Sequence, residues 1–218
     1  MCMAKVIELN KSVTESNDRD AQELREELKE KGLLLINLMS SPGSGKTTLL
    51  SRTITDINDE AKIAVLEADI ASDVDAVKIE SLGAKSIQVH TDGMCHMDAG
   101  MTRRGLFGMD LSDVKIAFLE NVGNLICPAE FDTGAHKNVM ILSVPEGDDK
   151  PLKYPLMFSM VDALVITKMD TKGYFTFDLD ACIEHVKKLN RNVQIFPVSA
   201  KTGEGMDAWE AWLKENLF

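Results

Sequence analysis

Apolar runs and segments with helical periodicity alternate along this chain. The run LLLINLM has no apolar–polar alternation, which is typical of a central strand buried on both faces of a sheet. Strands alternating with helices predict an α/β fold with a mostly parallel sheet and helices on both faces. Strands are predicted at 33–39, 62–68, 85–89, 114–120, 139–144, 163–167 and 193–199. Helices are predicted at 18–31, after 40–48, and at 74–82, 97–107, 178–189 and 205–218.

The first predicted helix, 18–31, is amphipathic. Ala21, Leu24 and Leu28 share one face, and Gly32 follows as a stop. We expect this helix to pack on the body of the protein or on a partner. The predicted organisation is an N-terminal segment with this helix (1–31) and one P-loop domain (32–218).

Composition narrows the class of protein. The chain has 218 residues and a net charge of −11, which argues against an electrostatic nucleic-acid binder. No apolar run reaches the roughly 18 residues of a membrane span, and the first residues do not resemble a signal peptide. We therefore expect a cytoplasmic protein that binds neither nucleic acid nor membrane.

The segment SSPGSGKTT (40–48) follows a predicted strand and precedes a helical stretch, which is the context of a phosphate-binding P-loop. Lys46 can reach the β- and γ-phosphates, and the Thr47 hydroxyl can ligate Mg²⁺. Ser40 departs from the consensus, which has glycine there. The backbone of the loop is expected to wrap the phosphates at Gly43, Ser44, Gly45, Lys46, Thr47 and Thr48.

Acidic residues follow two predicted strands. Glu120 ends VKIAFLE, and Gly123 follows three residues later, a pattern resembling a Walker B and γ-phosphate-sensing element in which Glu replaces Asp. Asp69, Asp73 and Asp75 follow the strand 62–68. One of them is expected to join the Mg²⁺ shell or orient water, although Asp73 and Asp75 equally suit solvated acids at a helix start.

Two motifs favour guanine over adenine. TKMD (167–170) ends a strand, and the Asp170 carboxylate can accept from guanine N1–H and N2–H₂, while the Lys168 stem covers the base. Thr167 departs from the usual asparagine of this motif. In SAK (199–201), Ser199 and Ala200 follow another strand, and the Ala200 N–H can donate to guanine O6.

Cysteines and histidines suggest a transition-metal site. Cys95 and His96 are adjacent, and Cys127 lies seven residues after Glu120 on the loop that leaves the phosphate-sensing strand. Thiolate and imidazole suit Ni²⁺ or Zn²⁺ and are poor ligands for Mg²⁺. His90 and His136 are either further ligands or isolated surface histidines.

These motifs, with ENVGNLICPAEFD (120–132) and EGDDKPLKYP, resemble the HypB family of GTPases that assist nickel insertion into [NiFe]-hydrogenase. The resemblance covers about residues 30–205. It implies a fold of the signal-recognition and nitrogenase-iron-protein class, GTP/GDP and Mg²⁺ as cofactors, and dimerisation with nucleotide. It further implies Ni²⁺ or Zn²⁺ at Cys95, His96 and Cys127, Mg²⁺ at Thr47 and Glu120, and Lys153 reaching nucleotide across the dimer.

The sequence departs from many HypB relatives at its N-terminus, where only Cys2 stands in place of a cysteine-rich nickel motif. The predicted function is a slow, Mg²⁺-dependent GTPase and nickel metallochaperone that works with hydrogenase maturation partners and the hydrogenase large subunit. One alternative is a urease-type nickel GTPase, against which Cys127-Pro128-Ala129 argues because that relative carries Cys-Pro-His. The other is a zinc- or nickel-binding protein with a vestigial P-loop.

Overall fold

The computed structural model describes residues 9–68, 74–91 and 93–218, with the backbone alone at 9–14 and 74–76. Asp69, Asp73 and Cys2 lie outside the described residues, as does the side chain of Asp75. The strands are β1 (Leu34–Ser40), β2 (Ile63–Glu67), β3 (Lys85–Gln88), β4 (Ile116–Glu120), β5 (Lys137–Ser143), β6 (Ala163–Thr167) and β7 (Gln194–Pro197). The α-helices are α1 (Leu9–Glu30), α2 (Lys46–Ile57), α3 (Val74–Ser81), α4 (Ala99–Leu106), α5 (Lys150–Lys153), α6 (Pro155–Ser159), α7 (Leu179–Leu189) and α8 (Met206–Glu215).

The strands form one parallel sheet in the order β3-β2-β4-β1-β5-β6-β7. All seven residues of β1 are buried, as its continuous apolar run predicts. The chain moves to one side of β1 for β2–β4 and to the other for β5–β7. The carboxyl end of β1 is therefore a topological switch point, where open α/β sheets bind ligands.

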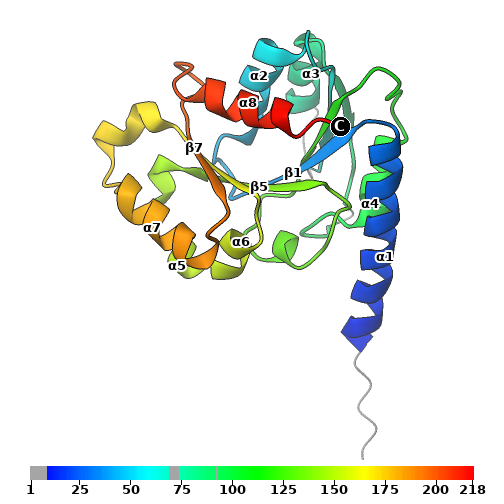
Figure 1. The fold of residues 1–218 in the computed structure, drawn as a ribbon, viewed down its shortest axis with the longest axis horizontal. Helices are drawn as coiled ribbons and strands as arrows, with labels where there is room; N and C mark the ends of the chain where they lie inside the picture. Colours follow the sequence, from blue (N-terminus) through cyan, green and yellow to red (C-terminus); the bar gives the residue numbers. More distant parts are fainter. Residues whose placement is uncertain (1–8, 69–73, 92) are drawn as a thin grey trace, which may run out of the picture.

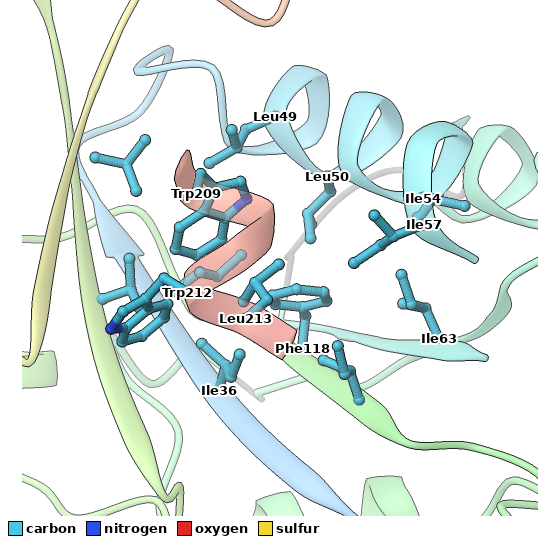
Figure 2. Packing of buried hydrophobic residues seen from close by; sticks show 14 of the residues in the cluster. Ile36, Leu49, Leu50, Ile54, Ile57, Ile63, Phe118, Trp209, Trp212 and Leu213 are labelled. Carbon is cyan, nitrogen blue, oxygen red and sulfur yellow. The ribbon is translucent and has the colours of Figure 1, made fainter. Parts of the chain in front are cut away.

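Helices cover both faces of the sheet (Figure 1). The core under α2, α3 and α8 includes two tryptophans of α8, and Trp209 donates its indole N–H to Thr53 of α2 at 3.0 Å. Figure 2 shows α8 packed beside α2, with side chains of both helices meeting those of the sheet. The opposite face is covered by α1 and α4 over one half and by α6 and α7 over the other. The predicted α/β class with helices on both faces is confirmed.

The amphipathic face of α1 packs on the body of this chain. Ala21, Leu24 and Leu28 are fully buried, and α1 lies beside α4 in Figure 1. Helix α1 begins at Leu9, well before the predicted start at residue 18. Polar residues between 9 and 18 carry no apolar stripe, so periodicity does not reveal this first part.

Two short helices, α5 and α6, were not predicted. Each is five residues or shorter and carries a proline in its first turn. Proline is tolerated there because the first N–H groups of a helix have no acceptor within it. Segments this short show no readable apolar period.

Candidate nucleotide and metal sites

The P-loop connects the carboxyl end of β1 to the first turn of α2. Gly45 has a φ of 96°, in the left-handed region that favours glycine, so a side chain there would strain the backbone. A cavity of about 580 Å³ opens beside the loop. It is lined by Pro42, Gly43, Gly45, Lys46, Thr47, Thr48, Glu67, Ala68, Glu120, Asn121, Val122, Gly123 and Lys168.

Ser40, the departure from the P-loop consensus, holds the loop lysine. Its hydroxyl accepts a hydrogen bond from Lys46 Nζ at 2.9 Å and donates to the Ser41 carbonyl at 2.8 Å. Ser40 is fully buried. A glycine could make neither bond, so in this chain the hydroxyl positions the ammonium at the mouth of the cavity.

Two glutamates meet at the predicted magnesium position. Glu120 lies 3.4 Å from the Thr47 hydroxyl, which donates to it, and Glu67 is the register partner of Glu120 on the neighbouring strand β2. Glu67 also lines the cavity and accepts from the Ser86 hydroxyl at 3.2 Å. Sequence reasoning missed Glu67; its place at the end of an apolar strand was the available signal. The donor set of hydroxyl and carboxylates suits Mg²⁺.

Gly123 lies directly against the P-loop. A Cβ on it would be 3.0 Å from Pro42 Cγ and 3.2 Å from the Pro42 nitrogen. The loop after β4 thus touches the phosphate loop through backbone. The two loops are therefore in direct packing contact.

The guanine motifs surround a second cavity of about 290 Å³, next to the first. The Ser199 hydroxyl donates to Asp170 Oδ1 at 2.8 Å, and Asp170 and Ala200 both line the cavity. Thr167 donates to the Ser44 carbonyl at 2.6 Å, and Lys168 donates to the Gly43 carbonyl at 2.7 Å. Thr167, which departs from the usual motif, therefore connects the proposed base site to the P-loop.

The three predicted transition-metal ligands lie near one another. The Cys95 thiol hydrogen-bonds to that of Cys127, which raises the pKa of Cys95, and its Sγ lies 3.7 Å from His96 Nδ1. His96 is 7% exposed and stacks on Phe131 with ring centroids 3.8 Å apart. Within the described part of the chain, no three side chains are arranged to hold a metal ion. The structure thus contains two contacting pairs, Cys95 with Cys127 and Cys95 with His96.

The chemistry of these side chains fits a soft divalent metal. Burial lowers the pKa of His96, so its ring is neutral at pH 7, the form that binds metal. Its Nε2 is buried and has no hydrogen-bond partner among the described residues, whereas Nδ1 faces Cys95. Metal binding must release the thiol protons, because the thiolate is the ligand.

Other predicted or considered residues have different surroundings. Lys153 pairs with Asp149 at 2.6 Å on α5 and does not line either nucleotide cavity of its own chain. His136 accepts from the Leu35 N–H at 3.0 Å, and its Nε2 lies 2.9 Å from the Arg25 carbonyl. Both of its ring nitrogens are occupied by backbone, so it joins α1 to the sheet and is not a metal ligand.

Comparison with known proteins agrees with this geometry. Residues 34–197 match the family model described as the CobW/HypB/UreG nucleotide-binding domain. The chain is 42% identical to the hydrogenase maturation factor HypB of Azotobacter chroococcum mcd 1 over 98% of its own length and 70% of the relative. It belongs to the HypB family.

Solved structures support the same assignment. HypB from Helicobacter pylori in complex with nickel is 38% identical, with a TM-score of 0.87, covering 92% of this chain and 94% of that one. The signal recognition particle receptor FtsY of Elizabethkingia anophelis is 14% identical with a TM-score of 0.56, covering 89% of this chain and 70% of that one. The second likeness concerns the fold alone. No helix in the described ranges is long and apolar enough to cross a membrane.

Proposed function

We propose that this HypB-family chain is a cytoplasmic, slow, Mg²⁺-dependent GTPase that carries Ni²⁺, and alternatively Zn²⁺, for [NiFe]-hydrogenase maturation. One observation carries the proposal: a single loop joins the two sites. It leaves β4 at Glu120, touches the P-loop at Gly123 and reaches Cys127 as it enters a short 3₁₀ helix. The nickel complex of the H. pylori relative supports nickel as the cargo.

The chain's own residues divide the work at the nucleotide. Lys46 and the P-loop amides bind phosphate, and Asp170, held by Ser199, accepts from guanine. Thr47 and Glu120 would hold Mg²⁺, which supplies charge neutralisation on the phosphates when bound. Asp69 and Asp75 remain proposed for orienting water. An arginine aimed at the phosphates is not among the cavity-lining residues of the described chain, which fits low turnover.

A GTP-dependent homodimer is part of the proposal. Leu152 and Leu156 on α5 and α6 are 61% and 53% exposed, and Ile126, beside Cys127, is 58% exposed. Exposed apolar side chains favour a protein contact when they form a contiguous patch, and we propose that these three belong to one. Lys153 lies between these two leucines in the sequence, and we propose that it reaches the nucleotide of a second copy docked on this surface. The hydrogenase large subunit and maturation partners are the expected recipients.

Switch behaviour can be tested by nickel affinity in two nucleotide states. We expect the Ni²⁺ dissociation constant, measured from thiolate-to-nickel absorption, to differ between the GDP form and the form bound to a non-hydrolysable GTP analogue. Cys127→Ser should weaken Ni²⁺ binding in both forms, because a thiolate is lost. Lys46→Ala should lower GTP turnover by at least about tenfold, because a phosphate-binding charge is removed.

The control for Lys46→Ala is Lys62→Ala, which removes a surface lysine that pairs with Asp59. Equal turnover in Lys46→Ala and wild type would indicate the alternative, a metal-binding protein with a vestigial P-loop. Equal Ni²⁺ affinity in both nucleotide states would refute the switch.

A further inference from the structure

Asn121 lies between the two proposed sites. It follows Glu120 at the carboxyl end of β4, is 1% exposed and lines the phosphate cavity. Its side chain makes three hydrogen bonds, one to the neighbouring Val122 and two to distant segments at Met97 and Asn37, which neither phosphate binding nor metal ligation explains.

The Asn121 carbonyl oxygen is shared by two backbone donors. It accepts from the Met97 N–H at 3.2 Å and from the Val122 N–H at 2.9 Å. Met97 is fully buried and adjacent to His96, whereas Val122 is adjacent to Gly123 in the phosphate-sensing loop. An amide oxygen has two lone pairs, so it can serve both donors at once.

The Asn121 amide nitrogen is anchored to the centre of the sheet. It donates to Asn37 Oδ1 on β1 at 3.1 Å, and Asn37 in turn donates to Asn138 Oδ1 on β5 at 3.0 Å. The three asparagines therefore connect three adjacent strands. Buried amides that are satisfied in this way hold one orientation, since turning would leave polar atoms unpaired.

We propose that Asn121 is the positioning residue that couples nucleotide state to the Cys95–His96 segment. The N–H groups of Met97 and Val122 donate to the same Asn121 oxygen. When Val122 moves toward a γ-phosphate, its hydrogen bond to that oxygen changes, and the hydrogen bond from Met97 changes with it. The change then reaches His96, which is next to Met97. Cys127 responds separately, through the continuous backbone of its loop. Asn121 thus gives both ligand segments a connection to the P-loop. This inference rests on the proposed switch function.

The coupling can be measured as the ratio of Ni²⁺ dissociation constants in the GDP and GTP-analogue forms. By linkage, the same ratio must appear in the effect of Ni²⁺ on the affinity for the GTP analogue, which is a second and independent readout. We expect a ratio of at least about fivefold in wild type, in either direction. Asn121→Ala should bring it to within about twofold of unity, with Ni²⁺ still bound by the three ligands.

Asn37→Ala is the matched control. It removes the partner of the Asn121 amide nitrogen but keeps the hydrogen bonds from Met97 and Val122 to the Asn121 oxygen. It should keep the wild-type ratio. If Asn121→Ala keeps the wild-type ratio, or if Asn37→Ala loses it equally, the inference is wrong while the switch stands. If wild type itself shows a ratio of one, the proposed switch fails.

Discussion

Two residues that depart from the general P-loop and guanine-motif consensus have a structural role in this chain. Ser40 replaces a glycine and binds Lys46, while Thr167 replaces an asparagine and binds the Ser44 carbonyl. Both side chains are buried hydroxyls that bond to the P-loop. At the residue scale, the departures therefore organise the phosphate site instead of weakening it. Cys182, by contrast, is fully buried, and burial raises its pKa to about 12, which makes it an inert thiol.

Asp170→Asn should change the preferred base. In the proposed base site the carboxylate would accept from guanine N1–H and N2–H₂, whereas an amide offers one donor and one acceptor, which matches xanthine better. We expect the affinity for GTP to fall on the order of 10²-fold and that for XTP to rise, measured by competition with a fluorescent nucleotide. Asp180→Asn, an exposed acid at the start of α7, is the control. An unchanged preference for GTP in Asp170→Asn would remove Asp170 from the base site.

At the scale of elements, α2 and α8 join the nucleotide site to the end of the chain. Trp209 packs on α2, and near it Arg52 pairs with Asp56 at 2.5 Å. Glu210 faces this pair from α8, and burial, together with a hydrogen bond to Asp56, raises the pKa of Glu210 to about 7. The Arg52 guanidinium also lies against Gly203, in the loop that follows Ala200. Helix α8 thus supports both the P-loop helix and the guanine loop.

Stability of this interface should depend on pH. The folded pKa of Glu210 is above its ordinary value, 4.5, so the folded state binds more protons between pH 4.5 and 7. The stabilisation is present below pH 4.5 and is lost as pH rises through 7. Glu210→Gln should therefore raise the melting temperature at pH 8 more than at pH 5, in calorimetric scans. Glu23→Gln on the exposed side of α1 should show no such difference, and a pH-independent effect of Glu210→Gln would contradict the assignment.

At the scale of the whole molecule, the strand order brings the P-loop next to the glutamates that end β2 and β4. Strand β4 lies between β2 and β1, so Glu67, Glu120 and the P-loop meet at one edge. The loop that leads to Cys127 also starts at this edge of the sheet. Helices α5 and α6 lie away from the α1 side in Figure 1, leaving their leucines open to a second copy.

The proposed dimer predicts a change in mass with nucleotide. Light scattering after size exclusion should give about twice the GDP-bound mass in the GTP-analogue form. Leu156→Asp should keep the chain monomeric with either nucleotide, because a charge cannot be buried unpaired in an apolar contact. Phe107→Ser, which removes an exposed ring near α1, should still dimerise. A Leu156→Asp chain that dimerises like wild type would place the interface elsewhere.

Much of the fold and part of the site could be predicted from the sequence. Buried strands, helices and phosphate and guanine motifs depend on local periodicity and on short spacings, which a chain displays directly. Glu67 was missed because its role depends on its pairing with Glu120, and the sequence does not show that β2 lies beside β4. The first half of α1 and the short helices α5 and α6 were missed because they lack an apolar period.

By itself, the sequence determined the α/β class and the P-loop, and it predicted a guanine motif and residue types suited to a soft metal. Each of these depends on neighbouring residues in the chain. Only the tertiary structure decided that Asn121 bonds to Met97 and Asn37, that His96 is buried against Phe131, and that Ser40 holds Lys46. These contacts depend on strand order and on the packing of distant segments. The link between the phosphate loop and the proposed metal ligands is therefore a property of the folded sheet.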